Sequence, residues 1–303
     1  MARVIGILGS ARKDGYTMRV LAALLNAASK APGVQTECVQ LLDYTFGPCR
    51  SCYTCIRQAD HRCIQNDDMG GAGALWQKIE AAHAMVWASP VHRWTVDALI
   101  HLFIERLYPF IWSGELKGIP VATLAVASNQ GFQIEAHRAL CQLAFSVGAK
   151  YMGGLPVHAA YLGEALKDAA YLGERIAQAA LEDEKGRRAL TDEEMWLAYQ
   201  NTPWAVYPHY VANLTMGTAN PELSIIKRAL AQGAFSKAEA IALLQDADKA
   251  FDESMHYESL GKREQAIRSL VKASALWTHA TWKEFLETDL IRVPPPRAYR
   301  PLN

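Results

Sequence analysis

The chain has 303 residues, half of them hydrophobic, so it is long enough to bury a large core without disulfide staples. Its 31 basic and 31 acidic side chains balance, and no excess charge predicts binding to nucleic acid or to an anionic membrane. Charged residues or prolines interrupt the apolar runs before they reach the roughly 20 residues that a membrane-spanning helix needs. Nothing at the N-terminus resembles a signal peptide, and we therefore expect a soluble cytoplasmic protein.

The first residues have the pattern of a strand, a loop and a helix. Residues 3–9 form a short apolar run, and residues 17–30 place apolar side chains at helical spacing. The segment GSARKDGYT, residues 9–17, offers backbone N–H groups, hydroxyls and Arg12 just before a helix N-terminus, which favours an anion. It matches neither the P-loop nor the dinucleotide motif. It therefore predicts a site for a monophosphate such as that of FMN, the alternative being an ordinary turn rich in capping residues.

The same alternation continues to about residue 182. We expect further strands at 34–42, 84–89, 121–127 and 150–153, and helices at 69–82, 95–107, 133–147 and 164–181. Five strands that alternate with helices indicate an α/β fold, a doubly wound parallel sheet covered on both faces. In such a sheet, ligands bind at the carboxyl ends of the strands where the topology reverses.

Four cysteines crowd the segment 47–68. Cys49, Cys52, Cys55 and Cys63 have the spacing C-x2-C-x2-C-x7-C, which is typical of four-thiolate ligation of an iron–sulfur cluster. Zinc is the stronger alternative, although structural zinc sites usually take two ligands from each of two separated knuckles. Redox-active or merely structural thiols remain open, and a reducing compartment argues against disulfides.

These motifs together resemble the iron–sulfur flavoproteins, a group within the flavodoxin-like, NADPH-dependent FMN reductase superfamily. The resemblance covers about residues 1–182 and includes the loop GSARKDGYT, the four cysteines, the Asp67-Asp68-Met69 that follows them, and the segment 89–92, SPVH. It implies a five-stranded sheet of order 2-1-3-4-5, non-covalently bound FMN and a 4Fe-4S cluster held by the cysteines.

The resemblance also implies which residues hold FMN. The phosphate would be bound by Ser10, Arg12, Asp14, Gly15, Tyr16 and Thr17. The isoalloxazine would lie along Pro90, Val91, His92 and Trp94, with the loop 128–132, including Asn129 and Gly131, closing the other side. His92 is also the candidate catalytic proton donor, because an unperturbed imidazole titrates near neutral pH; the alternative is that it only caps a turn.

The composition shifts near residue 185, and we expect a first domain at 1–185 and a helical extension at 186–303. The extension has helical patterns at 192–199, 222–232, 237–260 and 263–286, of which residues 247–277 resemble a single tetratricopeptide hairpin. Residues 201–216 predict an irregular packed segment, and the proline-rich tail around 293–297 predicts extended chain.

The expected activity is that of an FMN- and 4Fe-4S-dependent oxidoreductase for electron transfer. The resemblance suggests ferredoxin or NAD(P)H as donor and a small molecule as acceptor. One alternative is an NAD(P)H-dependent FMN or quinone reductase whose cysteines bind zinc or no metal. Another is a helical-hairpin adaptor with a vestigial flavodoxin-like core. The lone hairpin favours a homodimer or homotetramer.

Overall fold

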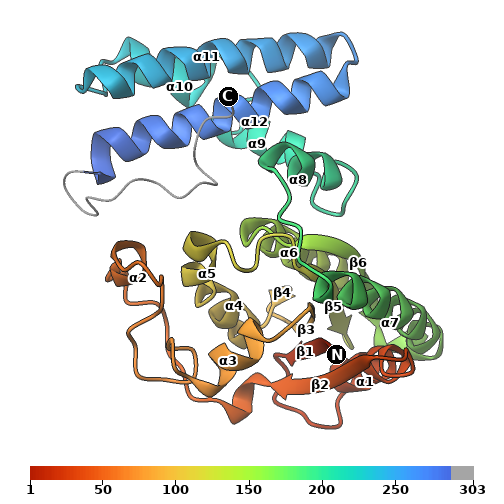
Figure 1. Cartoon of the computed structure of the whole chain (residues 1–303). Coiled ribbons are helices and arrows are strands. Elements are labelled where there is room, and N and C mark those ends of the chain that lie inside the picture. The colour runs from red at the N-terminus through yellow and green to blue at the C-terminus, as the bar shows by residue number, and fades with distance from the viewer. Residues whose placement is uncertain (288–303) are drawn as a thin grey trace. The chain divides into compact units, whose positions relative to one another are not determined.

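A computed structural model describes residues 1–287 of the chain (Figure 1). It divides into two compact units, residues 1–190 and residues from 191 onward, and each is described by itself. The proline-rich segment expected around 293–297 lies outside the described residues. No helix within residues 1–287 combines the length and the apolar character that crossing a bilayer requires.

The first unit contains a mostly parallel sheet. Its strands are β1 (Ala2–Leu8), β2 (Val34–Gln40), β3 (Ala84–His92), β4 (Thr95–Val96), β5 (Pro120–Ala127) and β6 (Lys150–His158). The parallel strands have the order β2-β1-β3-β5-β6, while the two-residue β4 pairs antiparallel with β3 as a short hairpin. Without that hairpin, the order is the 2-1-3-4-5 that the resemblance implies. The flavodoxin-like α/β fold is therefore confirmed.

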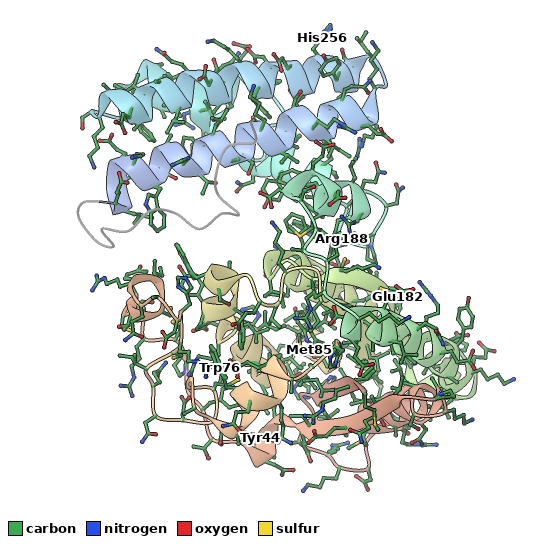
Figure 2. All side chains as sticks on the ribbon, viewed as in Figure 1. Tyr44, Trp76, Met85, Glu182, Arg188 and His256 are labelled. Atoms are coloured by element: carbon green, nitrogen blue, oxygen red, sulfur yellow. The ribbon has the colours of Figure 1, made fainter. Side chains whose placement is uncertain are left out.

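Both faces of the central strands are buried. Along β3, Ala84, Val86 and Ala88 join the core on one face, while Met85 and Trp87 join the core on the other. This period of two explains why the strand is a continuous apolar run, as is usual for parallel strands between two helical layers. Trp76 and Met85 are labelled in Figure 2, and both are almost fully buried in the core that contains Trp87.

Helices cover the two faces. The core on one face is formed with α1 (Tyr16–Ala28) and α7 (Leu162–Glu184), and the core on the other with α3 (Ala74–Glu80), α4 (Ala98–Glu105), α5 (Tyr108–Ser113) and α6 (Gln133–Ser146). α1 packs closely on α7, because a Cβ at Gly173 would lie 2.2 Å from the Leu24 carbonyl oxygen. The shorter elements are η1 (Leu41–Asp43), α2 (Thr54–Arg57) and η2 (Ala159–Tyr161).

Two expected helices begin later than their apolar patterns predict. The helix expected from residue 69 begins at Ala74, because the chain first turns through a glycine-rich segment in which the Asp68 carbonyl oxygen accepts hydrogen bonds from two later amides. The helix expected from residue 95 begins at Ala98, because Thr95 and Val96 pair with β3 and Asp97 caps the helix.

The second unit is helical. It contains α8 (Asp192–Ala198), α9 (Val206–Leu214), η3 (Pro221–Leu223), α10 (Ile225–Ala231), α11 (Ala238–Ser259), α12 (Arg263–Thr281) and a π-helical turn, Trp282–Leu286. α11 and α12 form the expected hairpin, which turns at Gly261 with φ +68°. The irregular segment expected at 201–216 is wrong in part, because residues 206–214 are helical; Pro208 is tolerated in the first turn, where amides have no partner within the helix.

Candidate functional site

The expected phosphate loop lies between β1 and α1. Ser10 and Thr17 are buried, whereas Arg12, Asp14 and Tyr16 are exposed. The loop is fixed from two sides: the Gln40 side-chain amide donates to the Ser10 carbonyl oxygen at 2.9 Å, and the Arg12 amide donates to the Ser10 hydroxyl at 3.1 Å. The loop is thus held by β2 and by its own hydrogen bond, while the charged side chains of Arg12 and Asp14 are exposed to solvent.

The N-terminus of α1 is open to an anion. Gly15 is the N-cap residue and has no side chain to accept from the first amides of the helix, and no acidic residue lies in the first turn. A helix of 13 residues therefore presents free N–H groups and its positive dipole end next to Arg12. A phosphate fits this arrangement because it supplies the acceptors and the negative charge that the sequence leaves out.

Asp97 connects this loop to the neighbouring strand end. Its carboxylate accepts the Ser89 hydroxyl at 2.8 Å and also accepts the amides of Leu99 and Ile100, so it caps α4. Burial raises the pKa of Asp97, although these hydrogen bonds oppose that shift. A Cβ at Gly9 would lie 2.2 Å from an Asp97 carboxylate oxygen, which shows how closely the end of β1 approaches the start of α4.

A pocket of about 330 Å³ opens beside the carboxyl ends of β3 and β5. It is lined by Val91, Arg93, Trp94 and residues 127–131. The Trp94 indole stacks on Phe132 with ring centroids 4.9 Å apart and donates to the Gln130 side-chain oxygen at 3.1 Å. These contacts join the β3–β4 hairpin to the loop after β5, so the pocket has an aromatic wall supplied by both segments.

The wall depends on unusual backbone conformations. Arg93, Trp94 and Phe132 have φ of 50°, 69° and 65°, in the left-handed region that favours glycine. Because bulky residues in this region carry strain, such positions concentrate at binding and catalytic sites. These conformations could not be predicted from the sequence, since it has no Asn-Gly or Asp-Gly pair at the hairpin turn.

The residues expected to contact the isoalloxazine divide into two groups. Val91, Trp94, Asn129 and Gly131 line the pocket together. Pro90 and His92 lie on the same strand, but neither is among the lining residues, and His92 is exposed. The catalytic role expected for His92 therefore stays a prediction.

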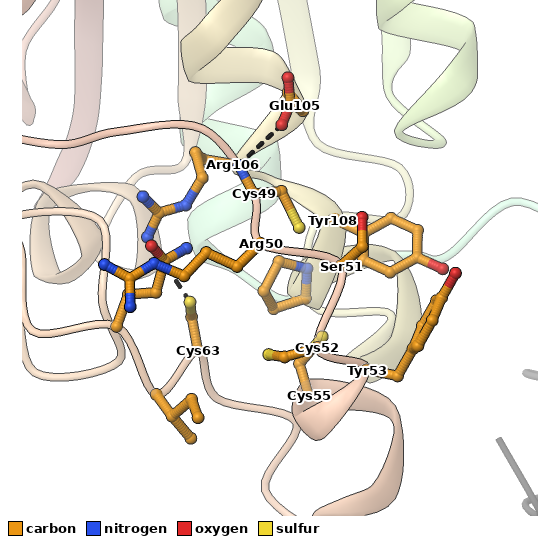
Figure 3. A pocket seen from close by; sticks show the side chains of 13 residues that line it. Cys49, Arg50, Ser51, Cys52, Tyr53, Cys55, Cys63, Glu105, Arg106 and Tyr108 are labelled. Carbon is orange, nitrogen blue, oxygen red and sulfur yellow. Dashed lines mark hydrogen bonds between the residues drawn. The ribbon is translucent and has the colours of Figure 1, made fainter. Parts of the chain in front are cut away.

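The four cysteines line a second cavity, of about 370 Å³ (Figure 3). Cys49, Cys52, Cys55 and Cys63 all border it, and none of them forms a disulfide. Tyr53, Ile64 and Tyr108 also line the cavity, so its wall is partly apolar. The spacing in the sequence therefore brings four free thiols around one space.

The electrostatics of these thiols differ. Burial, together with the neighbouring cysteines, raises the pKa of Cys55 to about 11. Hydrogen bonds from Thr54 lower the pKa of the exposed Cys52. Ligation by all four would release the proton of Cys55, since the thiolate is the ligand.

The backbone of the cysteine loop is also strained. Ser51, Tyr53 and His61 have φ of 48°, 56° and 52°. His61 is held by its Nδ1, which donates to the Cys55 carbonyl oxygen at 2.8 Å. The left-handed residues reverse the chain between successive thiols, which allows sulfurs close in sequence to line different parts of one cavity.

Two residues at the end of α4, absent from the sequence-based site, bind this loop. Glu105 accepts the Cys49 amide at 2.7 Å, and Arg106 donates to the Cys63 sulfur at 3.5 Å (Figure 3). Arg106 also pairs with Asp67, and although burial alone would raise the pKa of Asp67, the guanidinium holds it below its usual range. A signal was present: Arg106 continues the stripe of Leu99 and Phe103 at helical spacing, and a charge on an apolar stripe needs a partner.

Within residues 1–287, no group of three or more His, Cys, Asp or Glu side chains is arranged to hold a metal ion. What the cysteine loop offers is a donor set: four thiols that border one cavity. Four thiolates can ligate either zinc or an iron–sulfur cluster.

The first unit has relatives among known proteins. A family model described as NADPH-dependent FMN reductase matches residues 2–161. An iron–sulfur flavoprotein of Archaeoglobus fulgidus is 32% identical over 129 residues, 43% of this chain and 56% of the relative. One of Methanocaldococcus jannaschii is 30% identical over 132 residues, 43% of this chain and 65% of the relative. The chain thus spans about half to two thirds of the length of these relatives. The solved NAD(P)H:quinone oxidoreductase from Methanothermobacter marburgensis has a TM-score of 0.44 at 18% identity, covering 58% of this chain and 96% of that one.

Proposed function

We propose that this chain, which belongs to the NADPH-dependent FMN reductase family, is an FMN-dependent oxidoreductase that also holds a 4Fe-4S cluster. The observation that carries the proposal is the presence of two built sites in one unit. One is an open helix N-terminus beside an aromatic-walled pocket, and the other is a cavity bordered by four free thiols.

FMN binding is proposed at the carboxyl ends of β1, β3 and β5. The loop 9–17 and the first amides of α1 would bind the phosphate, with Ser10, Arg12, Asp14, Gly15, Tyr16 and Thr17 as the expected contacts. Val91, Trp94, Asn129 and Gly131 would bind the isoalloxazine in the pocket of about 330 Å³. A bound flavin would supply hydride and single-electron chemistry, while the chain orients the ring and shields one face.

The cluster part rests on the donor set. Cys49, Cys52, Cys55 and Cys63 would be the four ligands, and the names of the curated relatives agree with that assignment. A bound cluster would supply one-electron transfer. The chain's own contribution is to hold the strained cysteine loop in place through Glu105 and Arg106.

Helix α4 joins the two sites. It begins at the capping residue Asp97, beside the phosphate loop, and ends at Glu105 and Arg106, which bind the cysteine loop. Its eight residues span about 12 Å at 1.5 Å per residue. One helix thus contacts both the phosphate loop and the cysteine loop, and we propose that electrons pass between the two cofactors.

Anaerobic purification tests the proposal directly. The full chain should contain FMN and close to four iron and four sulfide per chain, which is the content of one 4Fe-4S cluster. Zinc together with FMN would favour the alternative of a flavin or quinone reductase without a cluster. Protein that holds neither iron nor flavin after reconstitution would contradict the proposal.

Cys52→Ser separates the two sites. The substitution should abolish or degrade the cluster, because it removes one thiol that borders the cavity, and it should leave FMN binding unchanged, because none of the residues around the flavin pocket belongs to the cysteine loop. Iron, sulfide and flavin content measured on the same sample give the readout. Loss of both cofactors would contradict the assignment of separate sites.

The reaction partners are a further part of the proposal. We propose NAD(P)H or ferredoxin as electron donor and a small molecule as acceptor, as the resemblance suggests. We also propose a homodimer or homotetramer as the assembly, because a lone helical hairpin needs a surface to pack on. Stopped-flow reduction of the flavin by NADPH, NADH and reduced ferredoxin identifies the donor. Sedimentation analysis of the loaded protein gives the assembly.

A further inference from the structure

Arg106 is buried more deeply than an arginine usually is. Its side chain is 1% exposed, and it ranks with Trp76, Trp87 and Tyr199 among the largest fully buried side chains of residues 1–287. Removing a guanidinium from water costs several kcal/mol unless its N–H groups are paired. The hydrogen-bond partners of Arg106 therefore indicate its role.

The hydrogen-bond partners of its guanidinium all belong to the cysteine loop. Nη1 donates to the Gly47 carbonyl oxygen at 2.7 Å and to Asp67 Oδ2 at 2.7 Å. Nη2 donates to Asp67 Oδ1 at 2.9 Å and to Cys63 Sγ at 3.5 Å. One guanidinium thus ties both ends of the segment 47–67 to the end of α4 and contacts one of the four sulfurs.

We propose that Arg106 is a positioning residue of the cysteine site, and that its hydrogen bond to the Cys63 sulfur, opposed by the charge of Asp67, sets the reduction potential of the cluster. The inference rests on the proposed function and deepens it. Hydrogen bonds to ligand sulfurs and the net charge around them are two of the factors that set such potentials.

Arg106 and Asp67 should have opposite effects on the reduction potential. Reduction adds one electron and makes the ligand sulfurs more negative. The Arg106 donor and its positive charge stabilise that state and raise the potential, whereas the Asp67 carboxylate destabilises it and lowers the potential. Arg106→Gln should therefore shift the potential downward, and Asp67→Asn should shift it upward.

The experiment uses the full chain, reconstituted with iron and sulfide under argon. The midpoint potential is measured by a redox titration followed by electron paramagnetic resonance, with iron content and melting temperature measured on each variant. Arg187→Gln is the matched control. Like Arg106, Arg187 pairs with a carboxylate, Asp183 at 2.7 Å, and donates to the backbone carbonyl oxygen of Ala82, but the hydrogen-bond partners of its guanidinium all lie outside the cysteine loop.

We expect a lower potential in Arg106→Gln, a higher one in Asp67→Asn, and an unchanged one in Arg187→Gln despite its lower melting temperature. Arg106→Lys keeps the positive charge but lacks the planar guanidinium that binds two acceptors at once. It should therefore lower the potential less than Arg106→Gln does. Should both Arg106 variants lose the cluster, Asp67→Asn decides: an upward shift supports the inference, and no shift overturns it. Potentials that are unchanged, or that move together in Arg106→Gln and Asp67→Asn, overturn it while leaving the proposed function intact. Wild-type chain that binds no iron and sulfide contradicts the proposed function itself.

Discussion

Arg12 packs against the N-cap residue at the open end of α1, since a Cβ at Gly15 would lie 3.2 Å from the Arg12 Cβ. Arg12→Ala should weaken FMN binding by about 1.5–3 kcal/mol, the usual contribution of a charge-assisted hydrogen bond to a phosphate. Quenching of flavin fluorescence during titration of the flavin-free protein measures the change. Lys13→Ala is the control, because the Lys13 ammonium lies 3.3 Å from Asp43 and is already paired. Equal losses in the two variants would mean that the phosphate lies elsewhere.

His137 predicts a dependence of stability on pH. Its Nε2 lies 2.7 Å from the Tyr151 hydroxyl, and burial lowers the pKa of His137 to about 4. The unfolded chain takes up a proton near pH 6.5, so it binds more protons than the folded chain between those values. The free energy of unfolding should therefore fall as the pH drops from about 6.5 to 4, by up to about 3 kcal/mol from this residue.

Urea denaturation at a series of pH values measures this effect, with His137→Gln as the comparison. The variant has no imidazole to protonate, so its stability should fall less steeply over the same range. Asp97, whose pKa burial raises, contributes the opposite slope, but it does so in both proteins. Identical slopes in the wild type and the variant would contradict the assignment.

How much of the site the sequence predicts depends on the kind of contact. The four cysteines that border one cavity are also close together in the sequence, and Ser10 and Thr17 belong to a consecutive strand, loop and helix, so both groups can be singled out without the fold. Arg106 and Glu105 lie about 40 to 60 residues from their partners in the chain, and only the fold brings them together. The strained conformations of Arg93 and Trp94 could not be predicted either, because neither residue type favours them.

At the scale of elements, backbone strain in the turn of the β3–β4 hairpin should lower the stability of the fold. Arg93 and Trp94 form its two-residue turn, and both have positive φ. Arg93→Asn should raise the free energy of unfolding by about 0.5–1 kcal/mol, because asparagine adopts the left-handed conformation more readily. Chemical denaturation measures the gain. Arg138→Asn, an arginine on the exposed side of α6, should lower stability instead, since asparagine is the poorer helix former.

If both variants gain stability, or if both lose it, the result contradicts the prediction that the hairpin turn is strained. Activity of Arg93→Asn is a separate matter, because Arg93 lines the flavin pocket. Stability is therefore the readout that isolates the backbone.

Element boundaries failed where glycine or proline had a specific role. The strand expected at 150–153 continues to His158, because Gly153, with φ +105°, allows the chain to continue along β5 through an irregular register. The helix at 206–214 was missed because its proline lies in the first turn. Periodicity, by contrast, predicted α11 to within one residue at each end, and the helix expected at 263–286 is observed as α12 followed by the π-helical turn at Trp282–Leu286, since buried positions repeat over many turns.

At the scale of the whole molecule, both proposed cofactor sites draw on one unit. The residues that line the flavin pocket, the phosphate loop and the cysteine cavity all fall within residues 1–190. The alternation of strands and helices in the sequence predicts the parallel sheet, whereas its strand order was implied by the resemblance to the iron–sulfur flavoproteins. The helical unit has no such pattern of chemistry-bearing residues, and its sequence predicts structure rather than a site.

This division predicts that residues 1–190, expressed without the helical unit, retain both cofactors. The shortened chain keeps all strands of the sheet, both helical layers and every side chain that we propose to bind FMN or the cluster. Its FMN and iron content per chain should equal those of the full chain prepared in parallel, and residues 191–303 alone should hold neither. A folded 1–190 chain, judged by circular dichroism, that lacks FMN would show that the helical unit supplies part of the binding site. The helical unit would then belong to the catalytic apparatus rather than to assembly.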